Sequence, residues 1–287
     1  MMPNTDTLYV SDLDGTLLGT DSLVSPTSAA IISDLCSRGA MITVATARTP
    51  ATVVPLLRHT GISMPAIVMT GAATWSIEQG RFIQTHILDS ADASLAVETV
   101  TRHGITPFIY TTAPAGSPLA LEVYHSAKAL NHMERNFVDA RADMPLKRFY
   151  LDTPMPPGCS DRVMLIFGMG EIDRIQAAAD DLTGRTGCYV SHYPDIFDPS
   201  AGLIEIYAPG VSKAAAMRRL AKECGAKRTV AFGDNLNDIP MLEAADVAVA
   251  MGNAQPQVKE IADIVTDANY TDSVARFIAQ DFRHHIK

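Results

Sequence analysis

Two acidic side chains, Asp12 and Asp14, stand near the start of the chain, directly after a short apolar run. The run, Leu8 to Ser11, is too short for a helix and contains aromatic and β-branched residues, so it predicts a buried strand. Side chains alternate along extended backbone, which lets both carboxylates point the same way, and Gly15 allows the chain to turn sharply after them. Such a pair can hold one metal ion and one substrate.

Other polar residues follow predicted strands in the same manner. Thr46, Thr70 and Asp234 each come at or just after the end of a short apolar run. Ligands bind at the carboxyl ends of the strands in open α/β sheets, so this pattern predicts one shared site. Lys213 begins a predicted helix, where a cation opposes the helix dipole, and we therefore expect that its charge serves another purpose.

The order of the elements predicts an α/β core assembled from both ends of the chain. Strands and helices alternate up to about Gly80, and the same alternation returns in the last third of the chain. This pattern is typical of a parallel sheet with right-handed crossovers. We therefore predict a core formed by residues 1–82 and 208–287, with an α+β domain, 83–207, inserted into it.

The inserted segment has a different texture, with proline-rich loops between extended stretches and helices. We predict strands at residues 107–111, 121–125, 162–167 and 203–207, and a helix at 170–183. Tyr124, His125, His132 and Arg148 could contact a substrate, but for each of them we favour a packing or surface role.

Composition excludes several classes of protein. The chain has 287 residues, 47% of them hydrophobic and 19% charged, with no apolar run long enough to span a membrane and no secretory signal, so we expect a cytoplasmic protein. A net charge of -9 without a Lys/Arg cluster argues against nucleic-acid binding. The four cysteines show no CxxC spacing and are expected to be reduced packing residues. We expect a monomer and leave a dimer open.

Taken together, the motifs resemble those of the haloacid dehalogenase superfamily, and within it the Cof-like sugar-phosphate phosphatases with a large inserted cap. The matching segments, in order, are Asp12–Leu17, Thr46 within Ala45–Arg48, Lys213 within Gly210–Lys213, and Gly233–Asp238. Met251–Ala254 and residues 262–269 also resemble that subgroup. The resemblance implies a Rossmann-like catalytic core and a cap, 83–207, that sets substrate specificity.

The resemblance also implies a role for each motif residue. Asp12 would attack phosphorus and form an aspartyl phosphate, and Asp14 would protonate the leaving group and then activate water. Mg²⁺ would be held by Asp12, the main-chain carbonyl of Asp14 and Asp234, with Asp238 close behind. The residues expected to bind the phosphoryl group and the rest of a small phosphate ester are Thr46, Ala47, Arg48, Lys213 and Asn237.

Three positions depart from the family pattern. Ala47 and Ala214 stand where glycine is common, and Thr70 stands where many relatives have asparagine. These differences affect the fine positioning of the site rather than the reaction expected of it.

Two other functions stay open at this point. The same motifs serve phosphotransferases and mutases, which pass the phosphoryl group to a sugar hydroxyl, and a non-catalytic regulatory protein could keep the phosphate-binding fold. The intact set of Asp12, Asp14, Lys213 and Asp234 favours a phosphatase.

Overall fold

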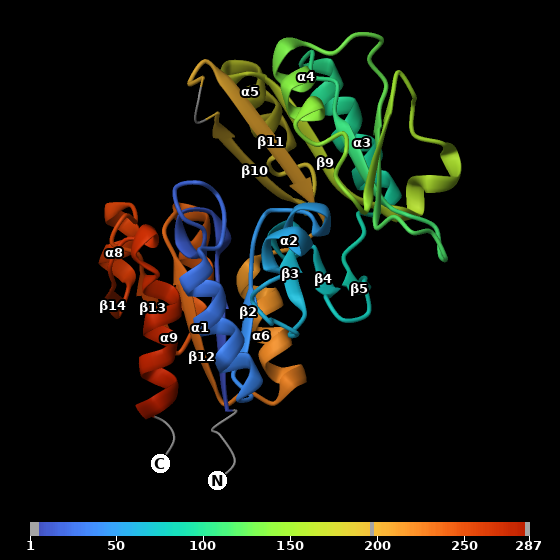
Figure 1. Cartoon of the computed structure of the whole chain (residues 1–287). Helices are drawn as coiled ribbons and strands as arrows, with labels where there is room; N and C mark the ends of the chain where they lie inside the picture. Colours follow the sequence, from blue (N-terminus) through green and yellow to red (C-terminus); the bar gives the residue numbers. More distant parts are fainter. Residues whose placement is uncertain (1–5, 196–197, 285–287) are drawn as a thin grey trace. The chain divides into compact units, whose positions relative to one another are not determined.

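The computed structural model describes residues 6–195 and 198–284, and the chain divides into two units (Figure 1). The first consists of Met1–Gln84 with Ser212–Lys287, and the second of Thr85–Val211. The predicted boundaries lay after residues 82 and 207. The first observed boundary comes later than predicted, after Gln84 and within β5 (Arg81–Thr85). The second also comes later, after Val211.

The first unit contains a five-stranded parallel sheet to which both ends of the chain contribute. Its order is β14-β13-β12-β1-β2, so β1 (Thr7–Ser11) pairs with β2 (Met41–Val44) on one side and β12 (Arg228–Gly233) on the other. The outer strands are β13 (Val247–Ala250) and β14 (Ile264–Val265). The α/β fold class predicted from the sequence is confirmed.

Helices cover both faces of this sheet. The step from β1 to β2 goes toward one edge of the sheet, and the step from β12 to β13 goes toward the other edge. Right-handed crossovers therefore place α1 (Pro26–Ser37) and α7 (Ile239–Ala244) on opposite faces. α1 packs against α9 (Ser273–His284), and α7 packs against α6 (Lys213–Cys224) (Figure 1). The remaining helices of this unit are α2 (Pro50–Leu57) and α8 (Pro256–Ile261).

The third predicted strand of the core is arranged differently from the expectation. β3 (Ala66–Val68) forms a bridge through Ile67 to Ala45, just after β2, but it belongs to a separate three-stranded sheet with β4 (Ala73–Ser76) and β5. The chain reverses after β3 at Met69 and Thr70, whose φ angles are 52° and 58°, and β4 then runs antiparallel to β3. This β3–β4 reversal was not predicted from the sequence.

The second unit is built on a six-stranded sheet of order β10-β11-β9-β6-β7-β8. All neighbouring pairs are antiparallel except β7 and β8, which are parallel. Its strands are β6 (Phe108–Thr112), β7 (Leu121–His125), β8 (Lys147–Leu151), β9 (Val163–Glu171), β10 (Tyr189–Pro194) and β11 (Ala201–Tyr207). The four predicted strands correspond to β6, β7, β9 and β11, whereas β8 and β10 were not predicted.

Helices pack on both faces of this second sheet. α5 (Ile172–Leu182), close to the predicted helix, lies so near β11 that a Cβ at Gly202 would come within 2.7 Å of Ile172. α3 (Ser90–Arg102) packs against α5 and β9. α4 (His132–Asp139) contributes Phe137, whose ring lies 5.4 Å from Phe108 and 6.1 Å from Phe149 on the other face. Neither α3 nor α4 was predicted.

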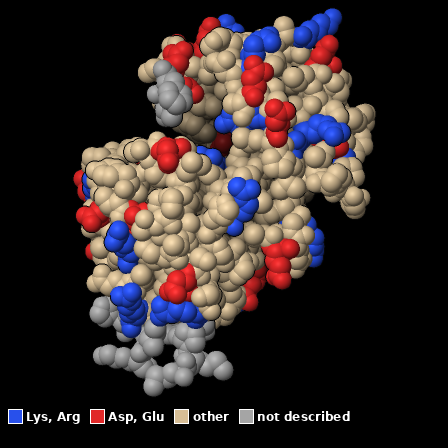
Figure 2. Space-filling view, in the orientation of Figure 1, with Lys and Arg blue, Asp and Glu red and all other residues tan. Residues whose placement is uncertain are grey.

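The surface agrees with the composition. Figure 2 shows acidic and basic side chains scattered over the visible face, with none of the large basic patches that nucleic-acid binding requires. Within the described residues, no helix combines the length and the apolar character needed to cross a membrane.

Candidate active site

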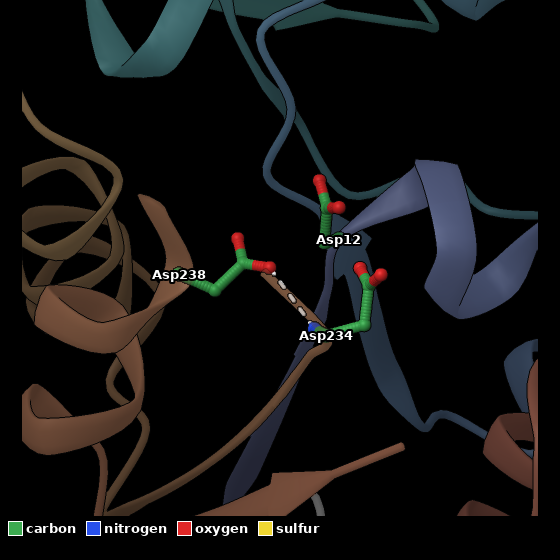
Figure 3. Close-up of side chains that lie close together, drawn as sticks. All are labelled: Asp12, Asp234 and Asp238. Atoms are coloured by element: carbon green, nitrogen blue, oxygen red, sulfur yellow. Dashed lines mark hydrogen bonds between the residues drawn. The ribbon is translucent and has the colours of Figure 1, made fainter. Parts of the chain in front are cut away.

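The carboxyl ends of β1 and β12 bring three aspartates together. These two strands are neighbours at the point where the strand order reverses, which is where open α/β sheets bind ligands. Asp12 follows β1, and its N–H donates to the carbonyl of Phe232 in β12 at 3.0 Å. One carboxylate oxygen each from Asp12, Asp234 and Asp238 lies within 4.8 Å of the others (Figure 3). The predicted convergence of side chains from distant parts of the sequence is therefore present.

Lys213 lies between two of these carboxylates. Ser212 caps α6 by accepting a hydrogen bond from the N–H of Ala215 at 3.0 Å, which fixes Lys213 at the first position of the helix. Its Nζ donates to Oδ1 of Asp12 and to Oδ1 of Asp238, both at 2.7 Å. The two buried carboxylates explain a cation at a helix N-terminus, where the dipole disfavours it.

Burial and mutual charge alter the protonation behaviour of this cluster. Burial raises the pKa of Asp12, and the nearby Lys213 only partly offsets this effect. Burial lowers the pKa of Lys213, but Asp12 and Asp238 outweigh it, so that the net shift is upward and the ammonium stays charged. Burial and the charge of Asp238 raise the pKa of Asp234 to about 6. A cation beside these carboxylates would relieve both the desolvation and the repulsion.

Asp238 is held by the turn that carries Asp234. Its Oδ2 accepts hydrogen bonds from the N–H groups of Asp234 at 3.1 Å and Asn235 at 3.2 Å, the first of which is drawn in Figure 3. This turn can close because residue 233 is glycine, since a Cβ there would lie 2.6 Å from Cβ of Asp238. With Oδ1 bound to Lys213, both oxygens of Asp238 are engaged. The Asp12 carboxylate interacts with Lys213 and with the main chain of Leu13, and Asp234 accepts a hydrogen bond from Thr16.

The loop after Asp12 approaches Asp234 closely. Thr16 donates from its hydroxyl to Oδ1 of Asp234 at 3.0 Å, a contact that the sequence analysis did not predict. Gly15 has a φ of +73°, and a Cβ there would lie 2.2 Å from Oδ2 of Asp234. A residue with a side chain at this position would therefore displace the metal-binding candidate Asp234.

Asp14 lies in different surroundings from Asp12. Its side chain is 56% exposed, compared with 9% for Asp12, and it forms a bidentate ion pair with Arg48. Nε of Arg48 donates to Oδ2 at 2.7 Å, and a terminal nitrogen donates to Oδ1 at 2.5 Å. The hydrogen bonds that Arg48 donates to Asp14 raise the pKa of the guanidinium. Arg48 was expected to bind substrate, and its pairing with Asp14 has no signal in the sequence.

Thr46 is buried at the base of the loop that carries Arg48. Its hydroxyl accepts the N–H of Arg48 at 3.1 Å, and its carbonyl accepts the N–H of Thr70 at 3.0 Å. Ala47 lies half-buried between Thr46 and Arg48. Gly71 brings this region to the start of α6, because a Cβ there would lie 2.3 Å from the carbonyl oxygen of Ser212. The predicted motif residues Thr46 and Lys213 are thus parts of one packed assembly.

Two asparagines outside the predicted site support the loop that holds Asp14. The side-chain nitrogen of Asn253 donates to the carbonyl of Gly15 at 2.8 Å, and that of Asn269 donates to the carbonyl of Leu18 at 2.7 Å. The N–H of Asn269 also donates to the side-chain oxygen of Asn253 at 2.9 Å. Asn237, which was expected to bind substrate, is exposed in the turn beside Asp238.

The donor set of this cluster fits a magnesium ion. Mg²⁺ prefers hard oxygen ligands and is bound through one or two carboxylates while it keeps several waters. Asp12 and Asp234 offer such oxygens, and three carboxylates beside a single ammonium leave an excess of negative charge. The side chain of Asp14 is paired with Arg48, which leaves its main-chain carbonyl as the predicted ligand from that residue.

Comparisons with known proteins agree with this arrangement. Residues 9–278 match the family model of haloacid dehalogenase-like hydrolases. The chain is 26% identical over 275 residues to a 5-amino-6-(5-phospho-D-ribitylamino)uracil phosphatase of Bacillus subtilis, covering 94% of each chain. It is 27% identical over 281 residues to a pyridoxal phosphate phosphatase of Escherichia coli, covering 93% of this chain and 95% of that one.

Solved structures show the same fold. A haloacid dehalogenase-like hydrolase from Bacteroides thetaiotaomicron superposes with a TM-score of 0.75 at 22% identity, covering 96% of this chain and 99% of that one. A sugar phosphatase of haloacid dehalogenase subclass IIB gives a TM-score of 0.72 at 20% identity, with coverage of 96% and 98%.

Proposed function

Because the chain belongs to the haloacid dehalogenase-like hydrolases and is a phosphatase of small phosphate monoesters, we propose that it works through an aspartyl phosphate on Asp12 with the help of Mg²⁺. The observation that carries this proposal is the placement of Asp12. Its carboxylate is buried at the carboxyl end of β1, where it accepts a hydrogen bond from Lys213 and lies within 4.8 Å of carboxylate oxygens of Asp234 and Asp238.

In this proposal Asp12 is the nucleophile. An Asp12 oxygen forms a bond to phosphorus as the bond between phosphorus and the ester oxygen breaks, and Asp14 donates a proton to the departing alkoxide. A water molecule then attacks the phosphorus of the aspartyl phosphate, Asp14 takes its proton, and Asp12 is regenerated as inorganic phosphate forms. Lys213 stabilises the negative charge on the transferring group in a site with little water.

The pairing of Asp14 with Arg48 adds a requirement to this sequence of steps. Both oxygens of Asp14 accept hydrogen bonds from the guanidinium, so at least one of them must be released before Asp14 can transfer a proton to or from the substrate. We propose that the phosphoryl oxygens compete for Arg48 when substrate binds. Thr46, the N–H groups of Ala47 and Arg48, and Asn237 complete the proposed phosphate-binding set.

Asp12, Asp234 and the main-chain carbonyl of Asp14 would hold Mg²⁺, and Asp238 would position Lys213 and the turn at Asp234. When bound, Mg²⁺ supplies positive charge against the phosphoryl oxygens. The raised pKa of Asp234 supports this assignment, because carboxylates crowded without a counter-ion are those that a divalent cation stabilises.

We propose that the substrates are small phosphate esters of the sugar-phosphate type and that residues 85–211 select the leaving group. The relatives support this class, since one acts on a ribityl phosphate derivative, another on pyridoxal phosphate, and a structural neighbour is a sugar phosphatase. Transfer of the phosphoryl group to a sugar hydroxyl is distinguished from hydrolysis by product analysis with an added sugar acceptor.

The decisive experiment is replacement of Asp12 by asparagine. With p-nitrophenyl phosphate and a panel of sugar phosphates, Asp12→Asn should lower phosphate release by at least about 10⁴-fold, because the variant loses the nucleophile. Asp34→Asn, which changes an exposed aspartate on α1, is the matched control and should retain the activity of the parent. Turnover by Asp12→Asn at the parent rate, in the presence of Mg²⁺, would sink the proposal.

A further inference from the structure

A short segment of the first unit joins the two loops that carry the candidate metal ligands. This segment, residues 252–255, lies between β13 and α8. The side-chain nitrogen of Asn253 donates to the carbonyl of Gly15, in the loop after β1, at 2.8 Å. The N–H of Gln255 donates to the carbonyl of Asp234, in the turn after β12, at 2.9 Å. One segment therefore contacts both halves of the candidate metal site.

The side chain of Gln255 makes a second contact with the turn after β12. Its Nε2 donates to Oδ1 of Asn235 at 2.8 Å, and the same oxygen accepts the N–H of Leu236 at 2.7 Å. Gln255 is the N-cap residue of α8, but its side chain accepts no hydrogen bond from the described N–H groups of that helix. Glutamine is not among the residues preferred at this position. The start of α8 thus does not explain Gln255, whereas its contact with Asn235 does.

The 252–255 segment is itself held in place. The N–H of Gly252 donates to the carbonyl of Asp267 at 3.1 Å, and Nζ of Lys259, on α8, donates to the carbonyl of Gly252 at 2.6 Å. The side-chain oxygen of Asn253 accepts the N–H of Asn269 at 2.9 Å, which leaves the amide nitrogen to face the loop after β1. The segment is therefore a fixed support for the two loops.

The exposure of the two amides indicates positioning rather than packing. Asn253 and Gln255 are both exposed residues. An exposed amide can bond to water instead, so its hydrogen bonds add little to stability, and ordering the side chain costs conformational entropy. What these bonds supply is a fixed spacing, because two loops bonded to one anchored segment cannot move apart independently.

Mg²⁺ depends on such a spacing more than Ca²⁺ does. Mg²⁺ requires near-octahedral oxygen ligands at about 2.0 to 2.1 Å, whereas Ca²⁺ accepts about six to eight oxygens at about 2.3 to 2.6 Å in flexible arrangements. In the proposed ligand set, the loop after β1 contributes Asp12 and the main-chain carbonyl of Asp14, and the turn after β12 contributes Asp234. A fixed distance between the two loops therefore favours the smaller ion.

We propose that the 252–255 segment, through Asn253 and Gln255, positions the loops of Asp14 and Asp234 for Mg²⁺ and thereby disfavours Ca²⁺. This inference rests on the proposed function and adds two positioning residues to it, neither of which is a ligand in the proposed set. Loss of a hydrogen-bonding group that orients metal ligands typically lowers metal affinity by about ten- to a hundredfold.

Metal titrations of the protein without substrate test this inference. MgCl₂ and CaCl₂ are titrated separately, and binding is followed by isothermal titration calorimetry and by the shift of the urea unfolding midpoint. For Asn253→Ala and for Gln255→Met, we expect the Kd for Mg²⁺ to rise about tenfold and the Kd for Ca²⁺ to rise less than about threefold. The preference for Mg²⁺ over Ca²⁺ should fall accordingly.

Gln257→Met is the matched control, because Gln257 is an exposed glutamine of α8 only two positions beyond Gln255. This variant should bind both ions as the parent does. Asn253→Ala and Gln255→Met act on different loops, so if circular dichroism shows one of them to be unfolded, the other is used. If both variants are unfolded, the amides hold the fold together and the positioning role is overturned.

The outcomes separate this inference from the catalytic proposal. A lower preference for Mg²⁺ in either variant, with Gln257→Met unchanged, supports the inference. If the parent binds Mg²⁺ and both variants keep its ratio of the two dissociation constants, the inference is overturned while the aspartyl-phosphate proposal stands. A parent protein that binds no Mg²⁺ would overturn the proposed metal site, and the inference with it.

Discussion

The two units of this protein carry buried charge of opposite kinds. In the first unit three carboxylates surround one ammonium, and Lys213 bonds directly to Asp12 and Asp238. In the second unit Lys147 is buried without a carboxylate partner among the described residues. The first cluster therefore has an excess of negative charge and the second an excess of positive charge. The carboxylates of the first cluster fit a cation, whereas the ammonium of Lys147 is itself a buried cation that no described carboxylate neutralises.

The largest effect is expected from removing Lys213, because its ammonium stabilises the buried carboxylates of the first unit. Replacing Lys213 by methionine leaves Asp12 and Asp238 buried without their cation, and breaking a buried pair in this way typically costs about 3 to 5 kcal/mol. We also expect kcat to fall by at least about 10²- to 10³-fold, as when a group that stabilises transition-state charge is removed. Urea unfolding in EDTA and phosphate-release assays with Mg²⁺ measure the two effects.

The matched control for this change is Lys227→Met. Lys227 forms an exposed ion pair with Asp6, and such pairs contribute little to stability. A loss of stability as small for Lys213→Met as for Lys227→Met would contradict the view that the first cluster is held together by its central ammonium.

A pH titration shows whether the first cluster lacks a cation. An unfolded aspartate has a pKa of about 3.9, whereas burial and Asp238 raise the pKa of Asp234 to about 6 in the folded protein. The folded state then binds the proton more tightly, so the Asp234 contribution to stability is lost as pH rises from about 4 to about 6. Above that range the ionised Asp234 carboxylate lowers the free energy of unfolding, and bound Mg²⁺ should offset this loss.

Urea unfolding between pH 4.5 and pH 7.5, in EDTA and in excess Mg²⁺, measures this dependence. Asp234→Asn is the reference, because the amide does not titrate and the difference between parent and variant isolates the Asp234 carboxyl. If the parent and Asp234→Asn show the same pH dependence in EDTA, the carboxylates of the first cluster are not mutually destabilised.

Removing the buried lysine of the second unit should raise the free energy of unfolding, whereas removing Lys213 from the first unit should lower it. Lys147→Met replaces an unpaired buried ammonium with an apolar side chain of similar length, and it forfeits one cation–π contact. The net result expected in urea unfolding without added anions is a gain of about 1 to 2 kcal/mol in the free energy of unfolding. A loss comparable to that of Lys213→Met would show that Lys147 has a structural partner and that the two clusters are alike.

The first cluster could be predicted from the sequence and the second could not, for a physical reason. Asp12, Thr46, Lys213 and Asp234 stand at the ends of strands and at a helix start, and parallel strands bring such positions to a single edge of the sheet. The β3–β4 reversal and the pairing of Asp14 with Arg48 depend on loop backbone that no periodicity encodes. Lys147 is a lone lysine in an unpredicted strand, and no periodicity in the sequence marks it as buried.

The smallest expected effect concerns backbone strain beside the first cluster. Thr70 has a φ of 58° and a ψ of 19°, a left-handed conformation that β-branched residues rarely adopt and that asparagine tolerates far better. The sequence departs from the family pattern at this position, where asparagine is common. Thr70→Asn should therefore raise the free energy of unfolding by about 1 kcal/mol. Urea unfolding checks this value, and Thr101→Asn, an exposed helical site in α3, is the control in which no gain is expected.

The same measurement sharpens the contrast between the two units. Thr70 N–H donates to the carbonyl of Thr46, so its strained conformation holds the loop from which Arg48 reaches Asp14. In the second unit Leu146, immediately before Lys147, also has a positive φ of 64°, and its carbonyl accepts two backbone hydrogen bonds from Ala120 and Leu121. If Thr70→Asn stabilises the protein without loss of kcat, strain at Thr70 is incidental to the phosphate site. A gain in stability accompanied by a lower kcat would instead show that the strained turn fixes the position of Arg48.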